Sequence, residues 1–193
     1  MLDFRPILFV VGLLLTTLAV AMSVPAIADA LAGHVDWRVF TISSGFTLFV
    51  GVSLVLAGRT AEMRLSLRQA FLLTTLSWLA VAIFAALPLA FSDLGLSYTD
   101  AFFEAMSGLT TTGSTVIVGL DDAPPGILLW RALLQWLGGV GIIVMAVAVL
   151  PVLQVGGMQL FQTESSDTSE KVLPRVAQVI TGIAVIYIGL TGI

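Results

Sequence analysis

The feature that most limits the fold of this chain is a series of long apolar stretches that are almost free of charged residues. A helix needs about 20 mostly apolar residues to cross a lipid bilayer. Four stretches reach this length, and they cover residues 7–28, 39–57, 70–91 and 128–150. A fifth stretch begins near Val176 and is still apolar at Ile193, so we expect the chain to be an N-terminal fragment of a longer membrane protein.

The composition supports this interpretation and excludes several functions. Charged residues make up 10% of the 193 residues and hydrophobic residues 58%, whereas a soluble domain carries about 25% charged residues. The chain has 8 Lys and Arg residues against 12 Asp and Glu residues and no basic run, which excludes nucleic acid as a main partner. It has no Cys and a single His, His34, so disulfides and metal clusters of several His or Cys ligands are excluded as well.

The first apolar stretch has two interpretations. Its end, Ala26-Ile27-Ala28, resembles the cleavage site of a signal peptide. However, the charges of Asp3 and Arg5 cancel, and the stretch is longer than the apolar region of a typical signal peptide. These features favour an uncleaved helix, in which Pro25 predicts a kink or the helix end.

The positions of the basic residues predict the orientation in the membrane, because short cytoplasmic loops are enriched in Lys and Arg. With the N-terminus in the cytoplasm, the inner side holds Arg5, Arg59, Arg64, Arg68, Lys171 and Arg175. The outer side then holds only Arg38 and Arg131. This orientation places residues 92–127, between the third and fourth stretches, on the outer side.

Residues 92–127 contain a pattern typical of a pore loop. An apolar stripe at helical spacing predicts a short helix from Tyr98 to Met106 and consists of Ala101, Phe102, Ala105 and Met106. We expect Thr99 or Asp100 to cap this helix and Gly108 to end it. Residues 109–116, LTTTGSTV, then form an extended stretch that returns outward. Such a re-entrant loop is tolerated at membrane depth where it lines a water-filled path or is buried in protein.

The residues of the extended stretch suit a monovalent cation that has lost its water. Such an ion needs a ladder of oxygens, which successive backbone carbonyls and Thr hydroxyls supply, and Gly permits the backbone angles that align carbonyls. The negative end of the short helix adds to the attraction. The candidate ligands are Thr110, Thr111, Thr112, Gly113 and Ser114. On pattern alone, an ordinary outer loop without function is an equal alternative.

The charged residues near this loop have simpler interpretations. We expect Arg131 either to pair with Asp121, Asp122 or Glu104 or to extend its side chain to the membrane interface. Asp121 and Asp122 are expected to be solvated. We expect no specific role for His34.

Three glycines, Gly138, Gly139 and Gly141, lie inside the fourth apolar stretch. Small residues there either allow close packing behind the loop or serve general packing between membrane helices. Because their spacing is not a regular small-residue repeat, general helix packing is the favoured interpretation.

Two runs of the sequence resemble a known family. They are TDAFFEAMSGLTTTGSTV, residues 99–116, and LLWRALLQWLGGVGIIVMAVAVLPVLQVGGMQLF, residues 128–161. Together they are similar to the TrkH-type potassium uptake subunits of the Trk/Ktr/HKT superfamily, and the resemblance is strongest over residues 70–161. It implies an all-α integral membrane protein whose pore has pseudo-fourfold symmetry. One chain builds that pore from four repeats of helix, re-entrant pore loop and helix, after an extra N-terminal helix pair.

The resemblance implies three parts of this chain. Residues 1–68 form the extra helix pair, residues 69–161 the first repeat with its selectivity filter, and residues 162–193 a cytoplasmic linker and the start of the second repeat. It also implies that carbonyls of Thr111, Thr112 and Gly113 bind K⁺. This loop is one of four in the filter, and three further repeats complete the pore.

The resemblance implies potassium transport across a bacterial cytoplasmic membrane, with no enzymatic activity and no cofactor besides the transported K⁺. Its implied partners are the lipid bilayer, a TrkA-like nucleotide-binding regulatory subunit on the cytoplasmic face and a second copy of the protein. The run QTESSDTSEKVLPR, residues 162–175, departs from the more basic stretch of many relatives, which affects only the details of coupling to that subunit. The alternative function is a membrane scaffold or assembly subunit whose Thr/Gly loop is structural.

Overall fold

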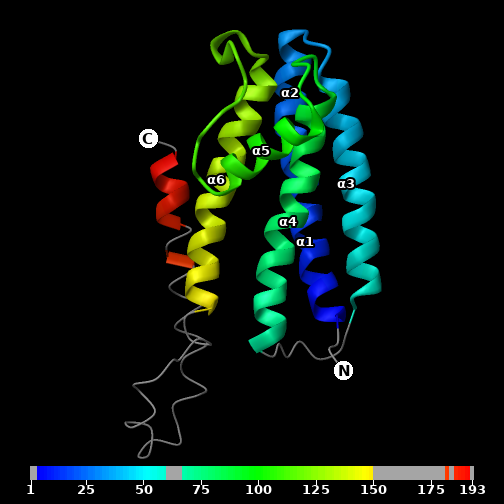
Figure 1. Ribbon diagram of the computed structural model, residues 1–193, viewed down its shortest axis with the longest axis vertical. Helices are drawn as coiled ribbons and strands as arrows, with labels where there is room; N and C mark the ends of the chain where they lie inside the picture. The colour runs from blue at the N-terminus through cyan, green and yellow to red at the C-terminus, as the bar shows by residue number, and fades with distance from the viewer. Residues whose placement is uncertain (1–3, 60–66, 150–180, 183–184, 192–193) are drawn as a thin grey trace, which may run out of the picture. The chain divides into compact units, whose positions relative to one another are not determined.

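The described part of the chain is helical (Figure 1). The computed structural model describes residues 4–59, 67–149, 181–182 and 185–191, and none of these lies in a strand. Its labelled helices are α1 (Arg5–Ala21), α2 (Ser23–Ala32), α3 (Trp37–Ala57), α4 (Leu67–Phe91), α5 (Tyr98–Leu109), the 3₁₀ helix η1 (Leu120–Asp122) and α6 (Pro125–Val149). The all-α prediction is therefore confirmed for this part of the chain.

Within the described residues, four helical segments are long and apolar enough to cross a membrane, and they agree with the four predicted stretches. They are Arg5–Ala32, Trp37–Ala57, Arg68–Phe91 and Pro125–Ile143. Of the predicted fifth stretch, residues 181–182 and 185–191 are helical, and the rest lies outside the described residues.

The chain divides into two compact units, Met1–Gly138 and Gly139–Ile193, each of which is described by itself. In the second unit the described residues are the end of α6 and the short helical segments near the C-terminus. The first unit contains the candidate site and every contact described below. The three-part division implied by the family resemblance stays a prediction.

The first membrane segment, Arg5–Ala32, is interrupted between α1 and α2. α1 ends at Ala21, α2 begins at Ser23, and Met22 between them forms a turn. Pro25 has no N–H to donate to the carbonyl of Ala21 four residues earlier, so the regular helix cannot continue through this turn. The sequence predicts a kink or the helix end at Pro25; the helix does not end there, and its interruption lies at Met22, three residues before the proline.

Two glycines bring α1 and α3 into close contact within the first unit. A Cβ on Gly12 would lie 2.7 Å from the carbonyl oxygen of Gly51, and a Cβ on Gly51 would lie 2.8 Å from the Oγ1 of Thr16. Lipid provides no hydrophobic drive for association between helices, so direct backbone contact at small residues stabilises such pairs. The close approach makes α1 and α3 a packed pair, and α1 also packs against α4.

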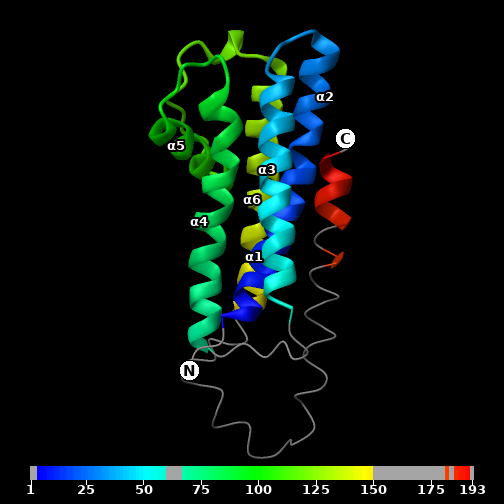
Figure 2. The same ribbon diagram turned by 90° about the vertical axis from the view of Figure 1, so that its right-hand side faces the viewer.

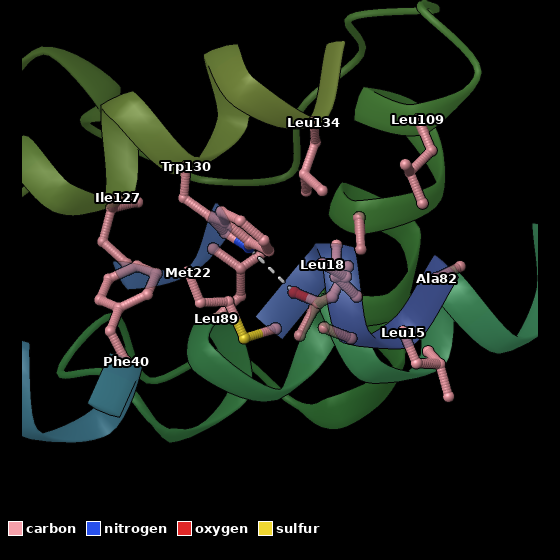
Figure 3. Close-up of a cluster of buried hydrophobic side chains, with 14 of the residues drawn as sticks. Leu15, Leu18, Met22, Phe40, Ala82, Leu89, Leu109, Ile127, Trp130 and Leu134 are labelled. Atoms are coloured by element: carbon pink, nitrogen blue, oxygen red, sulfur yellow. Dashed lines mark hydrogen bonds between the residues drawn. The ribbon is translucent and has the colours of Figure 1, made fainter. Parts of the chain in front are cut away.

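Trp130 of α6 lies in the buried core of the first unit (Figure 3). Its ring meets Phe40 of α3 edge-on, with 6.1 Å between the centroids. Its Nε1–H donates a hydrogen bond to the carbonyl of Ala85 in α4 at 3.0 Å, which the dashed line in Figure 3 marks. Pro88, three residues further along α4, has no backbone N–H to donate within the helix. Trp130 thus joins α6 to both α3 and α4.

Candidate functional site

The candidate site is the loop that follows α5, a short helix between α4 and α6. Figures 1 and 2 show α5 in the same half of the first unit as α2. With 12 residues, α5 is too short to cross a membrane. The predicted apolar stripe is confirmed by the burial or core packing of Ala101, Phe102, Ala105 and Met106.

The start of α5 is capped by Ser97 rather than by the expected Thr99 or Asp100. The Oγ of Ser97 accepts a hydrogen bond from the backbone N–H of Asp100 at 3.2 Å and donates one to the Asp100 carboxylate at 2.6 Å. A Ser followed three residues later by an acidic residue resembles a capping box, which was the signal for the correct residue. The prediction of the cap was wrong, because Thr99 and Asp100 already lie inside the first helical turn.

α5 does not end at Gly108, as expected, but continues to Leu109. Gly108 is buried, and a Cβ on it would lie 3.0 Å from the Cβ of Leu134 in α6. A Cβ on Gly138, one turn further along α6, would overlap the carbonyl oxygen of Leu109. Both glycines therefore allow α6 to pack directly against the end of α5. The interpretation of Gly138 as a residue of general helix packing was wrong, and it stays a prediction for Gly139 and Gly141.

After α5, the chain folds back over the helix end before it extends. The backbone N–H groups of Thr110, Thr111 and Thr112 donate hydrogen bonds to carbonyls near the end of α5, at 2.9–3.0 Å. These bonds satisfy carbonyls that a helix end leaves without intrahelical partners. The expectation of one extended stretch from residue 109 was wrong, because Leu109 is helical and Thr111 has a left-handed φ of 57°.

The same hydrogen bonds fix the direction of the loop's own carbonyls. The N–H groups of Thr112 and Gly113 both point at the carbonyl oxygen of Ser107, at 3.0 and 3.3 Å. In a trans peptide the C=O of one residue is antiparallel to the N–H of the next. The carbonyls of Thr111 and Thr112 therefore both point away from the end of α5. Gly113, with a φ of 78°, continues the chain in a conformation that favours glycine.

The side chains of the loop are held as well. The Oγ1 atoms of Thr110 and Thr112 lie 2.8 Å apart, and Thr110 Oγ1 also donates to the Met106 carbonyl at 2.9 Å. The carbonyl of Ser114 accepts a hydrogen bond from the Ser107 hydroxyl at 2.7 Å. Residues 110–114 are nevertheless exposed in this chain. They form an ordered surface with carbonyl oxygens that face away from the helix.

Glu104 of α5 holds the returning part of the loop. Its side chain is buried, and its Oε1 accepts hydrogen bonds from the Thr115 hydroxyl at 2.6 Å and the Ile117 N–H at 3.3 Å, and from the Val116 N–H. Carboxylates that accept several N–H and O–H bonds are strong anchors, because each bond is charge-assisted. The sequence predicts Glu104 only as one of three alternative partners for Arg131. In the sequence, Glu104 lies at helical spacing from Ala101 and Ala105, which are both buried in α5, and this spacing could have indicated that Glu104 is buried as well.

Arg131 pairs with Glu104, one of the three acids expected. Its Nε donates to the Oε2 of Glu104 at 2.9 Å. Asp121 and Asp122 are exposed, so the expectation that they are solvated is confirmed. One carboxylate thus joins α5, α6 and the loop.

These features define the class: a helical membrane protein with a repeat of helix, re-entrant loop and helix, formed by α4, α5 with its loop, and α6. The family model for TrkH, described as a cation transport protein, matches residues 37–192. This chain therefore belongs to the TrkH family, and the family resemblance is confirmed.

Individual relatives agree with this assignment. The chain is 43% identical over 188 residues to the Trk system potassium uptake protein TrkI of Halomonas elongata, with 97% of this chain and 38% of the relative covered. It is 42% identical over 191 residues to the Trk system potassium uptake protein TrkH of Escherichia coli strain K12, with 97% and 40% covered. The crystal structure of the potassium transporter TrkH from Vibrio parahaemolyticus matches with a TM-score of 0.83 and 40% identity, covering 98% of this chain and 38% of that one.

The chain therefore spans about two fifths of the length of these relatives. The relatives are named as transporters and not as enzymes, which agrees with the expectation for this chain. Their bacterial sources and the four apolar helices characterise a bacterial membrane protein.

Proposed function

We propose that this chain forms the first part of a pore through which K⁺ crosses the bacterial cytoplasmic membrane. Thr111, Thr112 and Gly113 contribute backbone carbonyls to the ion sites, with Thr110 and Ser114 beside them. Membership of the TrkH family and the names of the relatives, which are potassium uptake proteins, support the choice of ion.

The observation that carries this proposal is the shared direction of the Thr111 and Thr112 carbonyls. A dehydrated cation is bound where several oxygens face it together. The hydrogen bonds to Ser107 orient these two carbonyls away from α5, and no hydrogen bond within the described residues engages them. Glu104 holds residues 115–117, which follow these carbonyls in the loop. The carbonyl oxygens of Thr111 and Thr112 are therefore held in place before an ion arrives.

The loop supplies oxygens from one side only, and a complete ion site needs oxygens from all round the pore axis. We therefore propose that three further repeats of the natural protein surround the same axis. From the family resemblance we also propose a second copy of the protein and a TrkA-like nucleotide-binding subunit as partners. The N-terminus lies in the cytoplasm on this proposal, because six of the eight Lys and Arg residues then lie inside.

The test is ion flux through the complete natural protein, purified and reconstituted in liposomes. We expect K⁺ uptake that exceeds Na⁺ uptake, and no flux from liposomes that carry only residues 1–193. A scaffold or assembly subunit would give no flux above empty liposomes in either case, and that result would overturn the proposal.

A further inference from the structure

Three side chains with metal-binding atoms meet at the connection between α2 and α3. Asp29 lies on α2, His34 in the connection, and Asp36 directly before α3. One potential ligand atom from each lies within 4.8 Å of the other two. The sequence predicts no specific role for His34, and only the folded structure places it beside the two acids.

The local fold creates this cluster. α2 ends at Ala32, and Gly33 follows with a left-handed φ of 73°. The N–H of His34 then donates to the carbonyl of Asp29 at 2.9 Å, so the chain reverses tightly over the last turn of α2. This reversal places His34 and Asp36 beside the side chain of Asp29.

Both carboxylates are buried, and each has an oxygen without a hydrogen-bond partner. Asp29 is 0% exposed and Asp36 1% exposed, and the Oδ2 atoms of both are the buried side-chain oxygens without a partner in the described part of the chain. Buried polar atoms are nearly always satisfied, so two such atoms in one cluster require an explanation. A buried carboxylate is stable only when a positive charge or hydrogen bonds compensate it.

The contacts within the cluster do not supply that compensation. The Nδ1 of His34 lies 3.7 Å from the Oδ2 of Asp36, which is too long for a hydrogen bond, and it accepts a long bond of 3.4 Å from the Asp36 N–H. The carboxylates of Asp29 and Asp93 both lie near enough to act on that of Asp36, so three acidic side chains gather around a single imidazole.

We propose that Asp29, His34 and Asp36 bind one divalent transition-metal ion of the Zn²⁺ or Mn²⁺ type. Two carboxylate oxygens and one imidazole nitrogen suit these ions, whereas Ca²⁺ takes six to eight oxygen ligands. Ligand bonds of about 2.0–2.2 Å place the ligand atoms of a tetrahedral site about 3.3–3.6 Å apart. The three candidate atoms lie within 4.8 Å of one another, and the side chain of His34, 36% exposed, has room to move toward the two carboxylates.

Bound metal would strengthen the connection between α2, α3 and α6. The second oxygen of Asp29, Oδ1, accepts a hydrogen bond from the N–H of Gly126 in the first turn of α6 at 2.6 Å. A Cβ on Gly126 would overlap the Asp29 carboxylate, so this approach requires glycine. The proposed site is thus a structural one, separate from the ion-binding loop.

The test is metal binding by the complete natural protein, stripped with EDTA in detergent and titrated calorimetrically with Zn²⁺ and then with Mn²⁺. We expect one tight Zn²⁺ per chain and a higher unfolding temperature with the metal than without it, because a ligand that binds only the folded state stabilises it. Mn²⁺ binding, followed by electron paramagnetic resonance, is expected to compete with Zn²⁺.

The informative variants are His34→Ala and Asp36→Asn, because the side chain of Asp36 makes no capping hydrogen bond to α3 and asparagine keeps an oxygen that can accept the backbone hydrogen bond at Asp93. Each is expected to weaken Zn²⁺ binding by at least about tenfold and to lose the metal-dependent rise in unfolding temperature. The matched control, Asp121→Asn, removes an exposed acid and should bind Zn²⁺ like the natural protein. Failure of the natural protein to bind, or binding that both variants retain, would overturn the proposal.

Discussion

Arg131 and Glu104 form an ion pair with 2.9 Å between Nε and Oε2, and their side chains are 15% and 0% exposed. The pair connects α6 with α5, and the other oxygen of Glu104 holds the returning end of the candidate loop. A buried pair contributes little compared with apolar packing, but removal of one partner leaves an uncompensated charge. The geometry of the loop therefore depends on this carboxylate.

Glu104→Ala is expected to lower the free energy of unfolding by about 3–5 kcal/mol, because Arg131 and the loop N–H groups lose their partner together. Glu104→Gln keeps an acceptor for the loop but removes the charge, so we expect a smaller loss. Chemical unfolding in mixed detergent micelles measures both. The control Asp121→Ala removes an exposed acid and should change stability by less than about 0.5 kcal/mol. Equal stability of Glu104→Ala and the control would contradict the anchoring role.

Gly138→Ala tests the contact between α6 and the end of α5. The added Cβ would overlap the backbone carbonyl of Leu109, which cannot move without displacing the loop. We expect a loss of about 1–3 kcal/mol or more in unfolding free energy, from overpacking. In the matched control, Gly45→Ala in α3, the Cβ meets no atom within 4 Å, and stability should be unchanged or slightly higher. Tolerance of both substitutions would show that the observed contact is not essential.

The orientation in the membrane is tested by single cysteines, which residues 1–193 lack. Arg59→Cys and Asp122→Cys place them at exposed positions at the end of α3 and in the loop before α6. Impermeant maleimide added to intact cells should label only the second variant, and inverted vesicles should label only the first. Labelling of both from one side would overturn the proposal of a cytoplasmic N-terminus.

The four membrane helices were predictable because the bilayer imposes a simple rule on length and polarity. The break before Pro25 was predictable for a similar reason, since proline acts on its own helix. Local signals of this kind require only neighbouring residues. Even so, the prediction of the cap was wrong at Ser97, because Ser97, Thr99 and Asp100 all favour a cap and lie within four positions.

The parts of the site that could not be predicted depend on contacts between distant segments. Glu104 meets Arg131 across 27 positions of the sequence, and Asp29 meets Gly126 across 97. No periodicity shows which glycine will face a carbonyl on another helix, so the role of Gly138 emerged only from the packed structure. The candidate loop itself was found from its residues, but the direction of its carbonyls follows from hydrogen bonds to the end of α5.

Two glycine substitutions with the same backbone effect test whether the candidate loop, residues 110–114, binds the transported ion. Gly113 and Gly119 have φ angles of 78° and 72°, so a serine at either position costs about 1–2 kcal/mol of backbone strain. A Cβ on Gly113 would also lie 3.2 Å from the Nε2 of Gln135, whereas none of the surrounding atoms lies within 4 Å of a Cβ on Gly119. Only Gly113 belongs to the proposed ligand set.

Gly113→Ser in the complete natural protein should therefore reduce K⁺ uptake, or weaken the preference for K⁺ over Na⁺, while the amount of protein in the membrane stays nearly unchanged. Gly119→Ser carries the same strain outside the ligand set and should leave uptake close to the natural level. Tracer uptake of Rb⁺ and Na⁺ into cells that lack their own potassium uptake systems measures both effects. If the two variants behave alike, the carbonyls beside Gly113 do not bind the transported ion, because strain alone then accounts for the result.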